Sequence, residues 1–329
     1  MLLASCASAP APTTAAAPSV APARVAKGEV LGRSDRFLIY QPSADDTLAT
    51  IAAQFLGETD RDWVIGDFNG LSKPIAGQPL VVPLKPINPM GVQGDRYQTV
   101  PILCYHRFGG ASSKMSVSPA NFAAQLDWLA RNDYRVIRLS QLAGFLQGRE
   151  ALPKRAVVIT MDDGYESVHR HALPVLRKYG FPATLFTYTD FIGAGDALSW
   201  GQLAELKSSG LVDIQAHSKT HRNLIERVAG ETDEKYRQSL DTEMRAPREL
   251  LERRLAIQVS QFAFPYGDAN EAVLEALTRQ QYQLAVTVYP GGNAFFAMPL
   301  MLRRTMIFGD ADLEAFKAKL QISRASGAS

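Results

Sequence analysis

The chain is poor in several features on which common folds and functions depend. Cysteine occurs only at Cys6 and Cys104, which excludes a framework of structural disulfides. No apolar run approaches the roughly 20 residues that a membrane-spanning helix needs. Neither sign of charge is in excess, because 35 Lys and Arg face 33 Asp and Glu, and the net charge of +2 gives no reason to expect nucleic acid as a partner.

What the chain does contain is enough apolar material for more than one core. Its 329 residues exceed the usual size of one domain, and 46% of them are hydrophobic. Composition and patterning divide the chain into four parts: a tether over 1–36, a small module over 37–84, a linker over 85–98 and a main domain over 99–323.

The first residues resemble the end of a bacterial lipoprotein signal peptide. Leu3-Ala4-Ser5-Cys6 resembles a lipobox, in which Cys6 would become the lipidated N-terminus. The apolar segment before it is shorter than the about 7 to 15 residues of such a peptide, so either translation starts further upstream or the match is a coincidence. Residues 7–25 are rich in Ala, Pro and Thr, as disordered tethers are. The lipoprotein interpretation predicts an exported protein of the bacterial cell envelope, held to a membrane through Cys6.

Residues 37–84 are predicted to form a small βααβ unit. Strand-like residues begin at Phe37, a helix with apolar residues at helical spacing follows Asp45, and a second strand ends at Pro83. This resembles a LysM module, a fold that binds glycans containing N-acetylglucosamine, such as peptidoglycan, and Asn69 stands where that family often has Asn. The competing interpretation is a packing cap on the main domain.

The main domain alternates short apolar runs with amphipathic ones. The predicted strands are 102–105, 136–137, 156–160, 183–188, 212–216, 262–265, 284–288 and 302–307. The predicted helices are 120–131, 140–147, 166–179, 201–209, 233–256, 270–280 and 311–320. Alternation of this kind predicts an α/β fold with a parallel sheet that is closed, or nearly closed, into a barrel.

Two polar motifs follow strand-like runs in this domain. Asp162 and Asp163 come directly after one run, and two adjacent carboxylates beside apolar residues need a cation or a proton to share. His217 and His221 follow another run and are four positions apart. Two imidazoles and one carboxylate make a facial metal set with open positions, which leaves the other Asp free to act as a base.

Together with Phe264-Pro265-Tyr266-Gly267, these motifs resemble the ordered motifs of polysaccharide deacetylases, the NodB-homology family (carbohydrate esterase family 4). The resemblance covers roughly residues 99–323 and implies a distorted barrel of about seven strands. It also implies removal of N-acetyl groups from an N-acetylglucosamine polysaccharide.

The resemblance assigns a role to each motif residue. Asp163, His217 and His221 would hold a divalent metal, with zinc as the default and Fe, Co or Ni as alternatives. Asp162 would be the base, and the backbone N–H of Tyr266 would help to hold the oxyanion. His106 ends the first strand and resembles the family's general acid moved to the front of the chain, as in the permuted branch that includes poly-N-acetylglucosamine deacetylases; the alternative is a His that only hydrogen-bonds at the strand end.

The chain departs from the usual family pattern at the third motif. Many members have Arg three residues before the Tyr, where this chain has Ala263, so the partner of Asp162 is an open question. Arg304, at the end of the last strand, is a candidate for that charge and for substrate binding, although an ordinary surface Arg is an equal alternative. Trp200 resembles the family's pocket-wall Trp, with simple packing as the alternative. Pro265 is a further candidate for substrate binding.

Two other functions compete with deacetylation. Non-haem iron oxygenases also use two His and one carboxylate, but they place them on a different fold and in a different order. A non-catalytic lipoprotein with a degenerate barrel would instead bind the cell wall through the LysM-like module. The substrate is open as well, because exopolysaccharide such as poly-β-1,6-N-acetylglucosamine and peptidoglycan both present N-acetylglucosamine to the site.

Overall fold

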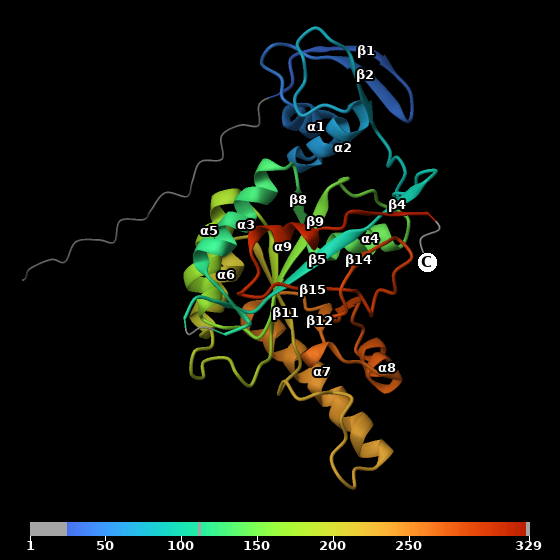
Figure 1. Cartoon of the computed structure of the whole chain (residues 1–329). Coiled ribbons are helices and arrows are strands. Elements are labelled where there is room, and N and C mark those ends of the chain that lie inside the picture. Colours follow the sequence, from blue (N-terminus) through green and yellow to red (C-terminus); the bar gives the residue numbers. More distant parts are fainter. Residues whose placement is uncertain (1–24, 111–112, 327–329) are drawn as a thin grey trace, which may run out of the picture. The chain divides into compact units, whose positions relative to one another are not determined.

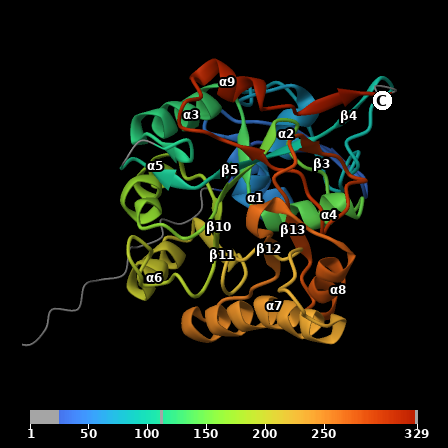
Figure 2. The same ribbon diagram turned by 60° about the horizontal axis from the view of Figure 1, so that its bottom comes forward.

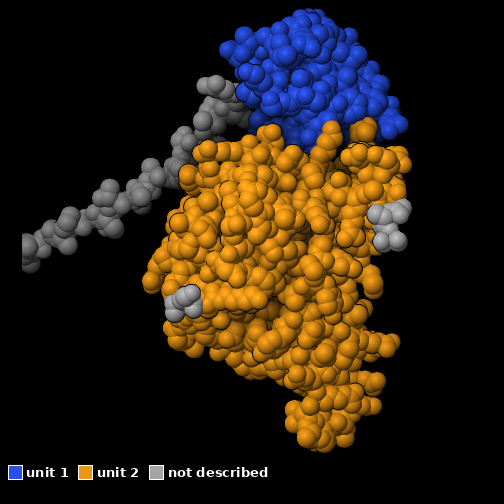
Figure 3. Space-filling view, in the orientation of Figure 1, with its two compact units in different colours: residues 1–85 blue, residues 86–329 orange. Residues whose placement is uncertain are grey.

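The computed structural model describes residues 25–110 and 113–326, and it separates into two compact units (Figures 1 and 3). The first unit extends to Lys85, and the second begins at Pro86. The structure does not describe residues 1–24. Cys6 and nearly all of the Ala/Pro-rich segment of the expected tether therefore lie outside the described residues. Among the helices of the described residues, none is long and apolar enough to cross a membrane.

The first unit is a three-stranded antiparallel sheet with two helices. Its elements are β1 (Glu29–Arg33), β2 (Phe37–Gln41), α1 (Leu48–Leu56), the 3₁₀ turn η1 (Thr59–Arg61), α2 (Asp62–Asn69) and β3 (Leu80–Pro83). The strand order is β1-β2-β3. Thr47 caps the start of α1, and Gly57 ends it in the left-handed conformation. The buried apolar residues of the sheet and both helices form a separate small core.

Strand β1 corrects the predicted boundary of this unit. The tether was expected to extend to residue 36, but Glu29–Arg33 pairs with Phe37–Gln41 through an antiparallel ladder. Four of the five β1 residues are exposed, so the strand lies at the edge of the sheet without the hydrophobic alternation that would have revealed it. The predicted strand and helix of the module are otherwise found as β2 and α1.

The second unit contains a curled sheet whose main path is parallel. The order is β13-β12-β11-β10-β9-β5-β14, with β8 paired to β9 and β15 paired to β5. The strands are β5 (Val100–Tyr105), β8 (Arg135–Ile137), β9 (Ala156–Met161), β10 (Ala183–Thr187), β11 (Val212–Ala216), β12 (Gln261–Ala263), β13 (Leu284–Val286), β14 (Gly292–Asn293) and β15 (Thr305–Met306). Only β14 in this set is antiparallel to its neighbour.

The two ends of the curled sheet are linked by the segment 302–306. Leu302 forms a parallel bridge with Val286 of β13, and β15 pairs in parallel with Leu103 and Cys104 of β5. The segment therefore lies between β13 and β5. Both faces of these strands are buried: Ile102 contributes to one apolar cluster and Leu103 to the other, which is why the strands appear in the sequence as continuous apolar runs.

Helices surround this sheet on its outer side (Figure 2). They are α3 (Pro119–Arg131), α4 (Leu142–Leu146), α5 (Leu173–Tyr179), α6 (Trp200–Ser208), α7 (Asp233–Leu255), α8 (Glu271–Arg279) and α9 (Leu313–Ala318), with the short turns η2 (Leu139–Gln141), η3 (Val168–Ala172) and η4 (Pro265–Gly267). Each helix lies within or beside a range predicted from periodicity. The α/β architecture expected for the main domain is therefore confirmed.

Short strands outside the main sheet were not predicted. β4 (Arg96–Gln98) pairs with β16 (Ser323–Ala325), and β6 (Arg107–Phe108) pairs with β7 (Ser116–Val117). The expected linker, 85–98, therefore ends in a strand of the second unit, and that unit continues to at least Ala325 rather than ending at 323. These strands are only two or three residues long, which is too short to leave a period in the sequence.

Candidate metal centre and active site

The predicted site residues come together at one edge of the sheet. Asp162 and Asp163 follow β9, His217 follows β11, His106 follows β5, and Tyr266 lies in the turn after β12. These strands run parallel, so their carboxyl ends point to the same edge. This is the edge at which barrel folds of this kind place their chemistry.

Three of these side chains form a compact donor group. One ligand atom from each of Asp163, His217 and His221 lies within 4.8 Å of the other two. Asp163 Oδ1 is 3.5 Å from His217 Nε2 and 3.2 Å from His221 Nε2. The same oxygen is buried without a hydrogen-bond partner. An orphaned carboxylate oxygen that faces two imidazole nitrogens fits a divalent cation of the zinc type.

His217 is oriented by a second contact. Its Nδ1 lies 2.8 Å from the backbone carbonyl oxygen of Ala263, to which it can donate, and this leaves the lone pair of Nε2 directed at the donor group. Burial lowers the pKa of His217, but Asp163, Asp162 and the Ala263 carbonyl outweigh burial and raise the pKa above its usual value. Burial likewise raises the pKa of Asp163, but the two imidazoles hold it well below its usual range.

The backbone at the site is held in an uncommon conformation. Asp163, Ser218, His221 and Tyr266 all have positive φ, at 75°, 68°, 64° and 61°. Non-glycine residues rarely adopt this region, and such strain persists only where the surroundings enforce it. Each of the three motifs therefore turns sharply at or beside a residue that it contributes to the site.

Gly164 explains the third position of the Asp-Asp-Gly motif. Its φ is 88°, and a Cβ there would lie 2.4 Å from Oγ1 of Thr187. Any side chain would therefore force Thr187, at the end of β10, to move immediately beside Asp163. Only glycine allows the chain to turn this close to the neighbouring strand.

Asp162 is held by the buried Arg304. Nη1 and Nη2 of Arg304 each donate at 2.7 Å to a different carboxylate oxygen, and Nε donates at 2.8 Å to the Thr287 carbonyl. Burial raises the pKa of Asp162, but the charge of Arg304 outweighs burial and keeps the pKa below its usual value. Asp162 is thus an ionised carboxylate beside the donor group, as a base must be.

Arg304 therefore supplies the positive charge that Ala263 cannot. The side chain of Arg304 is fully buried and its donors are directed at Asp162, Thr160 and Thr287, so its geometry is that of a positioning residue rather than a substrate contact. The sequence could not separate this role from that of a surface Arg, because the two partners meet only when segment 302–306 joins the ends of the sheet.

His106 lies close to Asp162. Ligand atoms of Cys104, His106 and Asp162 are within 4.8 Å of one another. Because Arg304 already neutralises Asp162, this group is a poor site for a second cation. Burial lowers the pKa of His106, with the two Asp carboxylates opposing that shift, and its Nδ1 is buried without a partner. Burial thus favours the neutral form of His106, so the protonated acid that the sequence predicts must first take up a proton.

Aromatic rings surround His221. The ring centroids of Tyr188 and Tyr266 are 4.9 and 5.2 Å from that of His221, and Phe191 stacks on Tyr188 at 5.0 Å. The side chain of Tyr266 is 62% exposed. Tyr188 and Phe191, which follow β10, were not predicted as site residues, since nothing in the sequence separated them from aromatic residues of the core.

Two residues predicted to bind substrate occupy other environments. Trp200 begins α6, packs against the main core and lies under the guanidinium of Arg254, 4.8 Å from its ring centroid. Trp200 is half-buried in this packing, and its contact with substrate stays a prediction. Pro265 is buried and begins the turn that exposes Tyr266, so its part is to shape that turn.

Comparisons with known proteins identify a family and several relatives for this chain. A family model described as polysaccharide deacetylase matches residues 149–285. YxkH of Bacillus subtilis (strain 168), named as a polysaccharide deacetylase, is 30% identical over 230 residues, which are 70% of this chain and 79% of YxkH. The poly-β-1,6-N-acetyl-D-glucosamine N-deacetylase of Escherichia coli (strain K12) is 26% identical over 211 residues, 54% of this chain but only 31% of that enzyme.

Solved structures share the fold. IcaB from Ammonifex degensii superposes with a TM-score of 0.61 and 28% identity, over 70% of this chain and 98% of IcaB. The Streptococcus pyogenes deacetylase PplD, solved in complex with acetate, superposes with a TM-score of 0.62 and 25% identity, over 68% of this chain and 98% of PplD. On the match to YxkH and on this fold, the chain belongs to the polysaccharide deacetylases, a family of enzymes that hydrolyse amide bonds.

Proposed function

We propose that this chain is a metal-dependent hydrolase that removes N-acetyl groups from a polysaccharide containing N-acetylglucosamine. The observation that carries the proposal is the buried donor group of Asp163, His217 and His221 next to an ionised Asp162. A divalent ion held by this group would polarise the amide carbonyl and acidify the attacking water.

The other residues divide the proton transfers between them. Asp162 accepts the proton of the attacking water, and Arg304 holds its carboxylate in place. His106, whose ring lies near Asp162, gives a proton to the departing glucosamine nitrogen. Because burial favours the neutral form of His106, the imidazole takes up one proton before it acts as the acid, and the proton released by the attacking water balances that uptake. The products are acetate and a free amine on the sugar.

The oxyanion and the sugar have separate partners in this proposal. The backbone N–H of Tyr266 stabilises the tetrahedral oxyanion, as the positive φ of that residue turns the peptide at the site. The exposed ring of Tyr266, with Tyr188 beside His221, provides apolar faces on which a sugar ring can stack.

Poly-β-1,6-N-acetylglucosamine is the substrate we favour. Relatives from Escherichia coli and Staphylococcus aureus are named as deacetylases of that polymer, and IcaB shares the fold. The position of His106 before the other motifs, on a strand that neighbours β15, supports membership of the permuted branch. The small first unit is consistent with a LysM-like module, which would hold the enzyme near peptidoglycan. Lipidation of Cys6 would in turn anchor the enzyme in the bacterial envelope.

Acetate release is the experiment that tests the function. Zinc-loaded protein would be given N-acetylglucosamine oligomers with β-1,6 and β-1,4 linkages, beside an Asp162→Asn variant and an Asp163→Asn variant. We expect release from the β-1,6 oligomer, a metal-replete but inactive Asp162→Asn protein, and a metal-poor Asp163→Asn protein. If metal-loaded wild type released no acetate from either oligomer, the non-catalytic cell-wall-binding alternative would replace this proposal.

A further inference from the structure

Glu243 is a buried carboxylate on the core-facing side of α7. Tyr236, Leu240, Pro247 and Leu251 share that side, and Glu243 itself is 5% exposed. A carboxylate in such a position is costly unless donors satisfy it. Helix α7 thus packs on the core through its apolar residues, and the buried charge of Glu243 requires hydrogen-bond donors from a neighbouring segment.

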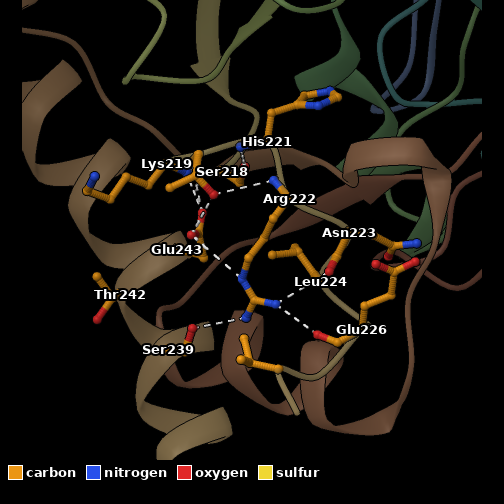
Figure 4. A network of polar contacts seen from close by, with 12 residues as sticks. Ser218, Lys219, His221, Arg222, Asn223, Leu224, Glu226, Ser239, Thr242 and Glu243 are labelled. Atoms are coloured by element: carbon orange, nitrogen blue, oxygen red, sulfur yellow. Dashed lines mark hydrogen bonds and ion pairs between the residues drawn. The ribbon is translucent and has the colours of Figure 1, made fainter. Parts of the chain in front are cut away.

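The donors of Glu243 all come from the loop that carries the metal-site imidazoles (Figure 4). Oε2 accepts from the backbone N–H groups of Lys219 and Thr220, both at 3.0 Å, and Oε1 accepts from Oγ1 of Thr220 at 2.8 Å. Both residues lie between His217 and His221. One carboxylate thus satisfies two consecutive backbone donors in the turn that brings the two imidazoles together.

Arg222 adds a second connection between the loop and α7. Its Nε lies 3.8 Å from Oε1 of Glu243, and its Nη2 donates at 3.0 Å to Oγ of Ser239, one helical turn earlier. Nη1 donates at 2.9 Å to the carbonyl of Glu226 further along the loop. Arg222 follows His221 directly, so both sides of that imidazole are fastened to the same helix.

The loop needs such support because its backbone is strained. Ser218 and His221 both have positive φ, and within the turn the His221 N–H donates to Oγ of Ser218, at 2.9 Å. Without Glu243, the N–H groups of Lys219 and Thr220 would lose their acceptor, and relaxation of the turn would separate Nε2 of His221 from Asp163.

We propose that Glu243 is a positioning residue that holds the 217–221 turn in its metal-binding geometry before any ion arrives. The inference rests on the proposed metal site and adds to it a residue that touches neither metal nor substrate. Removal of outer partners of this kind typically weakens metal binding about 10- to 100-fold.

Zinc affinity by chelator competition tests the inference on the full chain. Wild type would be compared with Glu243→Ala, with Glu243→Gln, which keeps one acceptor oxygen, and with Glu252→Ala. Glu252 is a matched control on the same helix: it accepts from the Val259 N–H at 3.0 Å and pairs with Arg248, away from the imidazole loop. Backbone hydrogen exchange at Lys219 and Thr220, measured without metal, gives a readout that does not depend on activity.

We expect Glu243→Ala to weaken zinc binding about 10- to 100-fold, and Glu243→Gln less, with faster exchange at Lys219 and Thr220 in both. Glu252→Ala should lower the melting temperature but keep zinc affinity within about threefold of wild type. If Glu243→Ala fails to fold, Glu243→Gln decides the matter. If a folded Glu243 variant kept the zinc affinity and the amide exchange rates of wild type, the positioning role alone would be overturned. If wild type itself bound no zinc, the proposed metal site would be overturned.

Discussion

Arg304 and Asp162 form a buried two-pronged ion pair across the junction of the curled sheet. Two guanidinium nitrogens each lie 2.7 Å from a separate oxygen of the carboxylate, and both side chains are nearly inaccessible to solvent. Arginine matches a carboxylate in this planar, bidentate way, whereas lysine offers only a point charge. The pair thus sets both the ionisation and the orientation of the proposed base.

Arg304→Gln should abolish most activity and destabilise the second unit. Breaking a buried pair by removing one partner leaves an uncompensated charge and typically costs about 3–5 kcal/mol. Arg304→Lys should not restore full activity, because it cannot bind both oxygens. Arg303→Gln is the control, since Arg303 is exposed and donates to the carbonyl of Pro290. Melting temperature and acetate release would be measured together, and a fully active Arg304→Gln enzyme would contradict the pairing role.

His106→Ala should affect substrates according to their leaving groups. Loss of a general acid typically costs about 10²- to 10⁴-fold when the leaving group needs a proton. We expect that loss for the N-acetylglucosamine oligomer but only a small change for 4-nitrophenyl acetate, whose leaving group departs as an anion. His169→Ala, which removes a partner of Glu205 on an outer turn, is the control. Equal losses for both substrates would argue that His106 has a purely structural part.

Tyr266→Ala should raise the KM for the oligomer while kcat changes little. Its exposed ring is the part offered for stacking, and the variant keeps the backbone N–H that is proposed for the oxyanion. An aromatic contact worth about 0.5–1.5 kcal/mol corresponds to a KM change of up to about tenfold. Tyr289→Ala, another exposed Tyr, provides the comparison. A large fall in kcat with unchanged KM would show that the side chain acts on the reaction step instead.

Gly164→Ala should lose both stability and metal affinity. Alanine at positive φ costs about 1–2 kcal/mol by itself, and here its Cβ would also meet Oγ1 of Thr187 at 2.4 Å beside Asp163. Gly180→Ala separates the two effects, because Gly180 has φ of 66° with nothing within 4 Å of a Cβ. Calorimetry with and without zinc would measure both. If Gly164→Ala and Gly180→Ala lost the same stability and bound zinc equally well, the contact with Thr187 would affect neither quantity.

The first unit should become less stable in acid through Asp46. Burial raises the pKa of Asp46, but hydrogen bonds from the Lys27 and Ser43 backbone and from the Tyr40 hydroxyl outweigh it and lower the pKa below 3.8. In the same contact, burial and Asp46 raise the pKa of Tyr40 to about 12. A group whose pKa is depressed on folding stabilises the protein above its unfolded value and loses that contribution as pH falls through the folded value.

Amide exchange of β2 in the full chain, corrected for intrinsic rates, would therefore accelerate as pH falls below about 4. The Asp46→Asn variant should lose that pH dependence, and the amides of its β2 strand should exchange faster than those of wild type at neutral pH. Asp45→Asn changes the adjacent, exposed carboxylate, which pairs only with the exposed Lys27, and should behave as wild type. A pH profile of Asp46→Asn identical to that of wild type would show that Asp46 does not carry the effect.

Much of the second unit could be predicted because its strands are buried on both faces and its helices on one. Those two conditions leave continuous apolar runs and 3.6-residue periods, so β9, β11 and α7 were found within a few residues of their observed bounds. Edge strands such as β1 leave neither signal. The site motifs were recognisable because Asp162, Asp163, His217 and His221 stand directly after such runs.

The partners of the site could not be predicted in the same way. Arg304 is distant from Asp162 along the chain, and only closure of the sheet brings the two together. The role of Glu243 did leave a trace, a charged residue among the apolar positions of α7, but its partners in the turn depend on tertiary contacts. Tyr188 and Trp200 show the same limit for aromatics, whose type is visible in the sequence but whose neighbours are not.

The junction at residues 302–306 also sets the order in which the protein can be completed during synthesis. Asp163, His217 and His221 leave the ribosome well before Arg304, so a growing chain can assemble its metal ligands while Asp162 still lacks its counter-charge. Until that last segment emerges, β13 and the Leu103–Cys104 part of β5, beyond its pairing with β14, are missing a neighbour, and open strand edges invite pairing between nascent chains. A late stop codon would thus yield an aggregation-prone product rather than a slightly weaker enzyme.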